Sequence, residues 1–244
     1  MSDDLTWARP AGPETGSGQG SAAARVVLRA SGVTRSFVRG SESVVALDGV
    51  DLELVGGELV ALVGRSGSGK TTLLNVLCGW EQPESGTVQW CGHPEGANVA
   101  DVMWEGISLV PQTPGLLEDL TVVENIGLPC RLRGDPDGPT ELAVAELLES
   151  LGLSELSERF PDEISLGEQQ RTSVARALLL VPDLLLADEP TAHQDAVSMS
   201  KVLDAIRSVV ATGRACLVAS HSAEVLRVAD RVLEMRDGRL SVSS

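Results

Sequence analysis

The stretch that most constrains this chain is a short apolar run that stops at a glycine-rich turn. Residues 59–72 read LVALVGRSGSGKTT, and the first five have the length and composition of a fully buried strand. Gly64, Gly69, Lys70 and Thr71 fit G-x-x-x-x-G-K-S/T, the pattern of a loop that wraps a phosphate chain. Glycines let backbone N–H groups approach the phosphates, and the following helix adds its positive dipole end. The stretch predicts a nucleotide phosphate site; a Gly/Ser-rich turn with a chance lysine is the alternative.

The loop residues divide the expected contacts among them. Lys70 would reach the β and γ phosphates, and the Thr71 hydroxyl would ligate Mg²⁺. The residues expected to contact the nucleotide are Gly64, Arg65, Ser66, Gly67, Ser68, Gly69, Lys70, Thr71 and Thr72.

Length and charge exclude several classes of protein. The chain has 244 residues, enough for one large domain or a domain with a subdomain. Its formal net charge of −16 would repel a phosphate backbone, so direct nucleic-acid binding is not expected. Pro182 and Asp183 interrupt the longest apolar stretch, which stays below the roughly 18 residues that span a bilayer. The acidic start MSDDLTW lacks the basic region of a secretory signal, which predicts residence in the cytoplasm.

Strand and helix patterns alternate along most of the chain, which favours an α/β fold with a parallel sheet covered on both faces. Residues 1–24 are rich in Gly, Ser, Pro and Ala, so we expect a disordered tail before one domain over residues 25–244. A helical pattern predicts an inserted subdomain over about residues 113–170. The expected strands are residues 26–33, 50–54, 59–63, 87–90, 107–110, 184–187 and 215–219, with a turn over 37–44 and a hairpin over 231–241. The expected helices are residues 71–77, 141–151, 166–180 and 197–211.

Two adjacent carboxylates follow the apolar run at residues 184–187. In an open parallel sheet, ligands bind at the carboxyl ends of the strands, where Asp188 and Glu189 would lie. Successive side chains of a strand point to opposite faces, so the two carboxylates would have different roles. We expect Asp188 to hold Mg²⁺ through water and Glu189 to orient and polarise an attacking water. A solvated acidic turn before Pro190 is the alternative.

Further motifs follow one another in a fixed order along the chain. They are GRSGSGKTT at 64–72, Gln112 after a strand, ISLGEQQR at 164–171, LLLADEPT at 184–191 and ASH ending at His221. With these motifs the chain resembles the ATP-binding subunits of ABC transporters from about residue 26 to its end. The resemblance implies a RecA-like P-loop NTPase core with a mostly parallel sheet, an N-terminal antiparallel β subdomain and an inserted helical subdomain. It also implies an ATPase that uses ATP and Mg²⁺, in which two subunits meet head to tail, most simply as a homodimer.

The resemblance assigns roles to single residues. Phe37 matches the aromatic side chain that stacks on adenine; core packing is the alternative. Gln112 matches the residue that touches Mg²⁺ and the attacking water and signals to the membrane partner. Asp195 matches the aspartate of the loop that links the two sites, and His221 matches the histidine that contacts the γ phosphate, with an ordinary loop histidine as the alternative. The expected catalytic residues are Lys70, Gln112, Glu189 and His221, and the expected metal ligands are Thr71, Gln112 and Asp188.

The signature motif at residues 164–171 has a physical explanation of its own. Ser165 can cap the helix while Glu168 returns a hydrogen bond, so S-x-x-E forms a complete capping box. A capped helix N-terminus also binds anions, and we assign Ser165, Gly167 and Glu168 to the nucleotide held by the other subunit. The positions that depart from the family pattern are Leu166, His193, Gln194 and Ser222. None of these departures removes a catalytic group.

The resemblance implies an ATP-hydrolysing subunit that powers a separate membrane permease from the inner face of the cell membrane. The segment ENIGLPCRLRG at 124–134 looks like the subgroup that serves lipoprotein-releasing and macrolide-exporting permeases, which favours export. One alternative is a mechanical role, in which ATP cycles move a membrane protein that activates a cell-wall hydrolase. A soluble ABC ATPase of DNA repair or translation is disfavoured by the net charge and by the short interval between Gln112 and Ser165. Glu189 argues against a regulatory module without turnover.

Overall fold

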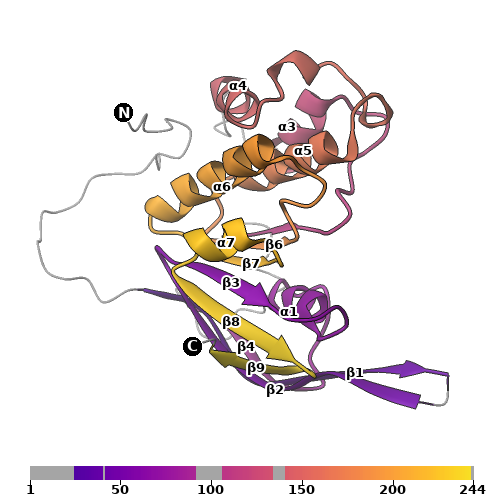
Figure 1. Ribbon diagram of the computed structural model, residues 1–244, viewed down its shortest axis with the longest axis vertical. Coiled ribbons are helices and arrows are strands. Elements are labelled where there is room, and N and C mark those ends of the chain that lie inside the picture. Colours follow the sequence, from indigo (N-terminus) through magenta and orange to yellow (C-terminus); the bar gives the residue numbers. More distant parts are fainter. Residues whose placement is uncertain (1–24, 41, 92–105, 134–140, 243–244) are drawn as a thin grey trace, which may run out of the picture.

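Two β-sheets and a group of helices make up the part of the chain that the computed structural model describes, namely residues 25–40, 42–91, 106–133 and 141–242. Figure 1 shows the antiparallel sheet at one end, most of the helices at the other and the larger sheet between them. The expected disordered tail at residues 1–24 lies outside the described residues. The α/β class, with a mostly parallel sheet, an antiparallel subdomain and a helical insert, is confirmed.

The larger sheet has six strands, and five adjacent strands of the sheet run parallel to one another. In order across the sheet they are β5 (Ile107–Val110), β6 (Leu184–Asp188), β7 (Ala215–Ala219), β3 (Leu59–Val63), β8 (Arg231–Arg236) and β9 (Arg239–Val242). The last strand, β9, is antiparallel to β8, as the predicted hairpin over residues 231–241 requires, and Asp237 and Gly238 form the turn that joins them. Apart from Asp188 at the end of β6, the central strands are apolar because both faces of the sheet are covered.

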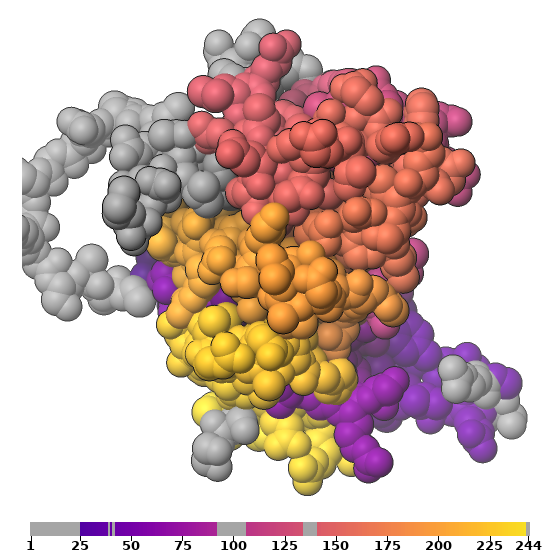
Figure 2. All heavy atoms as spheres, turned by 45° about the horizontal axis from the view of Figure 1, so that its top comes forward, coloured from indigo at the N-terminus to yellow at the C-terminus, as the bar shows by residue number. Residues whose placement is uncertain are grey.

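The smaller sheet is antiparallel and contains a long hairpin. Its strands, in order, are β2 (Glu42–Val55), β1 (Val26–Arg39) and β4 (Ser85–Trp90). The predicted turn over residues 37–44 is wrong, because both strands continue and Phe37 pairs with Val44. β-branched and aromatic side chains favour extended backbone here, and the chain reverses only at Gly40, which has a φ of 66°. The hairpin projects from the rest of the molecule in Figures 1 and 2.

Helices cover the larger sheet. They are α1 (Lys70–Leu77), α3 (Val122–Arg133), α4 (Glu141–Ser150), α5 (Leu166–Leu178), α6 (Ala196–Ala211) and α7 (Ala223–Val228), with short 3-10 helices at Ser154–Leu156 and Pro161–Glu163. Helix α5 packs against α3, α6 and β5, and so connects the helical insert to the sheet. Helix α7 was not predicted. It has only six residues and begins at a Ser222 cap directly after His221.

The core consists of two hydrophobic clusters, one on each face of the larger sheet. In β3, Leu59 and Ala61 belong to the cluster under α3, α5 and α6. Val60 and Leu62 belong to the cluster shared with α1 and the smaller sheet. This alternation also applies to β6 and β7, so residues at the ends of these strands are directed to different faces.

Candidate functional site

The glycines of the phosphate loop are required by their packing as well as by their backbone angles. Gly64 and Gly69 have φ values of 153° and 109°. A Cβ on Gly64 would overlap the Met235 carbonyl, and one on Gly69 would overlap the Ala46 carbonyl. Gly67 has a φ of 78° and no atom near the position of a Cβ, so only its backbone angle requires glycine. The loop is therefore held between β8 and β2.

The Lys70 ammonium lies inside this loop. Its Nζ donates hydrogen bonds to the carbonyl oxygens of Gly64 at 2.6 Å and Arg65 at 3.2 Å. The side chain is buried at the first residue of α1, where the helix dipole is also positive. The carbonyls of the loop hold the buried Lys70 ammonium where it can bind a polyphosphate.

Thr71 and Asp188 form an oxygen pair beside the loop. The Thr71 hydroxyl donates to Asp188 Oδ2 at 2.6 Å, and Asp188 is buried at the end of β6. Strand alternation directs Asp188 to the face that carries α1, which is why these two residues meet. A hydroxyl and a carboxylate are ligands that suit Mg²⁺, so this pair fits the metal. Within the described ranges, no group of three or more His, Cys, Asp and Glu residues is placed to hold an ion.

Glu189 lies next to Asp188 but contacts the end of β7. Its Oε2 accepts a hydrogen bond from Ser220 Oγ at 2.9 Å, and its Oε1 lies 3.7 Å from His221 Nε2. Its backbone N–H donates to the Ala219 carbonyl at 2.8 Å, and its φ is 49°. The adjacent carboxylates therefore have separate surroundings.

The N-terminus of α5 has the predicted capping box. The Glu168 N–H donates to Ser165 Oγ at 3.4 Å, while the Ser165 N–H and hydroxyl both donate to Glu168 Oε2 at 2.7 Å. The Ser165 side-chain and backbone hydrogen bonds lower the pKa of Glu168, so this box keeps its carboxylate ionised. The Leu166 side chain, at the first helical position, is 46% exposed.

Asp195 caps the neighbouring helix α6. Its Oδ1 accepts hydrogen bonds from the N–H groups of Val197 and Ser198 at 2.9 Å, and these bonds, Ser198 first, lower the pKa of Asp195. The loop before it touches α5, because a Cβ on Gly167 would lie 2.7 Å from the His193 carbonyl oxygen. His193 itself has a φ of 60°.

Phe37 and Gln112 lie away from the contacts described above. Phe37, on the projecting hairpin, is 38% exposed and belongs to neither hydrophobic cluster, so the core-packing alternative is wrong. The Arg35 guanidinium lies 4.9 Å from the centre of its ring and is paired with Glu81 at 2.7 Å. Gln112 is exposed two residues beyond β5, and across the described ranges no hydrogen bond joins it to Thr71 or Asp188.

The structure brings together three strand ends. The loop after β3, the carboxylates of β6 and the Ser220–His221 pair of β7 meet at one edge of the sheet. Sequence reasoning missed Ser220. The sequence signal that could have indicated it is a serine directly between an apolar run and a histidine. The structure shows that this serine is buried.

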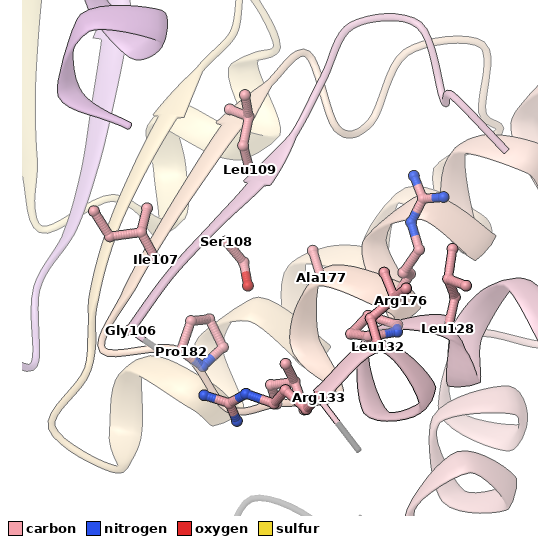
Figure 3. A pocket seen from close by; sticks show the side chains of 12 residues that line it. Gly106, Ile107, Ser108, Leu109, Leu128, Leu132, Arg133, Arg176, Ala177 and Pro182 are labelled. Atoms are coloured by element: carbon pink, nitrogen blue, oxygen red, sulfur yellow. The ribbon is translucent and has the colours of Figure 1, made fainter. Parts of the chain in front are cut away.

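A cavity whose lining includes none of these strand-end residues lies elsewhere on the molecule. It is an apolar groove of about 620 Å³ between β5, α3 and α5, and Figure 3 shows its walls. Ser108 of β5 points into the groove, Leu128 and Leu132 of α3 lie opposite, and the Ile107 and Leu109 side chains are directed to the other face of β5. The Arg176 guanidinium in this groove donates to the carbonyls of Gly115 and Pro114, both at 2.9 Å. None of the predicted site residues lines this groove.

Comparisons with known proteins agree with this geometry. The family model described as ABC transporter matches residues 47–192. The chain is 38% identical to the lipoprotein-releasing system ATP-binding protein LolD 1 of Rhodospirillum rubrum, over 88% of this chain and 98% of that protein. It is 37% identical to a probable syringafactin export ATP-binding/permease protein of Pseudomonas syringae and to a macrolide export ATP-binding/permease protein of Azoarcus. These two matches include 88% of this chain, and the chain spans only 34% and 33% of the length of those two relatives.

Solved structures show the same fold. A dimeric ATP-binding cassette, MJ0796, bound to ADP and Pi superposes with a TM-score of 0.79 at 27% identity, over 88% of this chain and 98% of that one. A second dimeric structure of that cassette gives a TM-score of 0.77 at 29% identity. No helix in the described part of this chain is long and apolar enough to cross a membrane. The matching motifs, sheet order and family model show that the chain belongs to the ABC transporter family, as an ATP-binding ATPase domain.

Proposed function

We propose that the chain is the ATP-hydrolysing subunit of an exporter and drives a separate membrane permease from the inner face of the membrane. The observation that carries the proposal is the meeting of Lys70, the Thr71–Asp188 pair and the Glu189–His221 pair at one sheet edge. The relatives named above, which serve lipoprotein release or export, support the direction of transport.

The residues of the site divide the work of hydrolysis. The loop N–H groups and Lys70 bind the phosphates, while Thr71 and Asp188 would hold Mg²⁺, which neutralises phosphate charge when bound. Glu189 orients the water that attacks the γ phosphorus, and the bond from that phosphorus to the β-γ bridging oxygen breaks to give ADP and Pi. The partly exposed His221 contacts the γ phosphate. Gln112 and Phe37 complete the site through contacts to the metal and water and to the adenine, respectively.

A second copy of the chain supplies the remaining contacts. The capped N-terminus of α5 is separated from the loop of its own chain, and no hydrogen bond or ion pair between described residues connects them. In a head-to-tail pair, Ser165 and the Gly167 N–H would face the γ phosphate held by the other copy. The dimers of the similar cassette support this arrangement.

The apolar groove between β5, α3 and α5 is the surface that we assign to the permease. A cytoplasmic segment of a permease with apolar side chains would fill it, because Leu128, Leu132 and Leu180 line it. Leu132 is 68% exposed, so its side chain is accessible to a segment placed in the groove. The names of two relatives join an ATP-binding part to a permease part in one protein, which supports such contact.

The test is ATP hydrolysis with the permease. A tagged form of the chain is used to purify the permease from membranes, and the chain and the permease are reconstituted together in liposomes. The permease should stimulate ATPase activity of the parent, and Leu132→Asp should abolish the stimulation without changing the activity of the isolated chain. Leu142→Asp is the matched control, since Leu142 is 65% exposed on α4 and lies outside the groove. No stimulation of the parent by any copurified membrane protein would overturn the transport role.

A further inference from the structure

The Ser220 hydroxyl is buried between the strands that carry the catalytic motifs. Ser220 is 1% exposed at the carboxyl end of β7, and its N–H donates to the Leu62 carbonyl of β3 at 3.2 Å. Its Oγ donates to Glu189 Oε2, beyond the end of β6, at 2.9 Å. One residue therefore connects the strand before the phosphate loop, the strand of the carboxylates and the histidine that follows it.

The direction of this hydrogen bond is set by a second one. The Ser222 N–H donates to Ser220 Oγ at 3.2 Å, which occupies an acceptor position on that oxygen. A carboxylate can only accept, so the single hydroxyl proton of Ser220 points to Glu189. The bond is charge-assisted and its hydroxyl is buried, which makes it stronger than an ordinary side-chain bond.

Glu189 is held at two points by consecutive residues. Its N–H donates to the Ala219 carbonyl, and its carboxylate accepts from Ser220. Its backbone has a φ of 49°, a left-handed conformation that a non-glycine residue keeps only where its surroundings hold it. The carboxylate is thereby turned so that Oε2 is occupied and Oε1 faces His221.

We propose that Ser220 is the positioning residue of the ATPase site: its hydroxyl occupies Glu189 Oε2 and so leaves Oε1 to orient the attacking water. This inference rests on the proposed catalytic role of Glu189. Without the hydroxyl, the carboxylate rotates among several orientations and the water meets the required geometry less often. ATP binding is unaffected, because Lys70 and the loop N–H groups hold the phosphates.

The experiment compares Ser220→Ala with Ser220→Thr, which keeps the hydroxyl. For Ser220→Ala we expect kcat to fall by about 10-fold to 100-fold, as for the loss of a hydrogen bond to a charged group. The KM and the ATP affinity should stay those of the parent, and Ser220→Thr should recover most of the kcat. Ser173→Ala is the control for burial: Ser173 is also 1% exposed, lies on α5 and has no hydrogen-bond partner for its hydroxyl among the described residues. It should keep the parent's kcat.

A double variant distinguishes positioning from a general structural effect. If Ser220 acts through Glu189, the Ser220→Ala change should have no further effect on the residual activity of Glu189→Gln. Independent, additive losses would overturn the inference, and so would a Ser220→Thr activity no higher than that of Ser220→Ala. If Ser220→Ala keeps the turnover of the parent while Glu189→Gln loses it, the positioning role of Ser220 is wrong and the catalytic role of Glu189 stands. Parent-like turnover in Glu189→Gln removes the proposed role of Glu189 itself.

Discussion

At the scale of single residues, the two adjacent carboxylates differ because strand geometry separates them. Asp188 belongs to the strand and meets Thr71 on the α1 side, while Glu189 has left the strand with a positive φ and meets β7. Asp188, in contact with the Thr71 hydroxyl, is suited to binding a metal ion. Glu189, beside the exposed His221, is suited to orienting a water molecule. Changing one of them should therefore not reproduce the effect of changing the other.

Glu189→Gln should retain ATP binding and lose steady-state turnover. The loop and Lys70 still hold the nucleotide, but an amide does not orient and polarise the water as the carboxylate does. Loss of one transition-state group costs about 10²-fold to 10³-fold in rate, or roughly 3–4 kcal/mol. We expect the variant to accumulate as an ATP-bound dimer in size-exclusion chromatography. Glu149→Gln, an exposed position on α4, is the control, and unchanged turnover in Glu189→Gln would exclude the catalytic role.

Phe37→Ala should weaken ATP binding more than it slows saturated turnover. Stacking on a base contributes about 1–3 kcal/mol, and the adenine is remote from the γ phosphate. Triphosphate alone should bind the parent and the variant equally, as measured by calorimetry. Val38 is the matched control because it is the next residue of β1, is 83% exposed and points to the other face. Normal ATP affinity in Phe37→Ala would remove the adenine contact.

At the scale of elements, the N-termini of α5 and α6 are connected through one close approach. Gly167 has no side chain, and the His193 carbonyl fills the space that a Cβ would need. His193 is in a left-handed conformation two residues before the Asp195 cap. A shift of either helix end therefore displaces the other, which would couple the two sites of a dimer.

Gly167→Ala should lower ATPase activity by pushing the loop before α6 away from α5. The obstacle is a backbone carbonyl, which cannot rotate out of the way as a side chain would. Gly127→Ala is the control: Gly127 lies inside α3, and no atom lies within 4 Å of the position of a Cβ. That control should raise the free energy of unfolding by about 0.5–1 kcal/mol and keep the activity. Equal activities of the two variants would show that the approach at His193 is unimportant.

Leu166→Gly should change turnover by less than about tenfold, or under roughly 1.4 kcal/mol in the barrier. The capping hydrogen bonds use Ser165 and Glu168, to which the Leu166 side chain contributes nothing. Leucine also adopts the helical backbone of the first turn without strain. The assay is ATPase activity of the complex with its permease. An inactive parent that gains activity through this change would show that the leucine disables the site.

At the scale of the whole molecule, an ion pair ties α6 to the larger sheet. Asp230 accepts two hydrogen bonds from Arg207 of α6, at 2.7 Å and 3.2 Å, and one from the Leu59 N–H at the start of β3. The Arg207 side-chain hydrogen bond lowers the pKa of Asp230 from its ordinary value. One carboxylate thus joins a helix from the second half of the chain to the strand that leads into the phosphate loop.

This pair should make stability depend on pH on the acid side. The folded-state pKa of Asp230 is depressed, so its contribution is fully present above the unfolded value near 4 and is lost as pH falls through the folded value. Because the two side chains are 38% and 42% exposed, solvent screening limits the contribution to less than about 1 kcal/mol. Asp230→Asn should show a shallower loss of unfolding free energy between about pH 4 and pH 2 in urea titrations. Arg207→Gln should do the same, and a slope equal to the parent's in both variants would contradict the assignment.

Local sequence patterns determined a large part of this protein. The phosphate loop, the buried strands around it and the capping box of α5 depend on neighbouring residues, whose spacing sets the hydrogen bonds and the alternation of faces. The order of the motifs was enough to indicate the family. The hairpin was misjudged because Gly and Ser in residues 37–44 indicate a turn locally, whereas pairing with the opposite strand extends both strands nearly to Gly40.

The tertiary structure decided the contacts between residues far apart in the chain. The Met235 carbonyl that requires glycine at Gly64, the His193 carbonyl against Gly167 and the Ser220 hydroxyl on Glu189 each join separate segments. No spacing rule predicts such contacts, since they depend on strand order, twist and the packing of helices on the sheet. The sequence by itself therefore determined which chemical groups the site contains, while only the fold decided how the Glu189 carboxylate is turned.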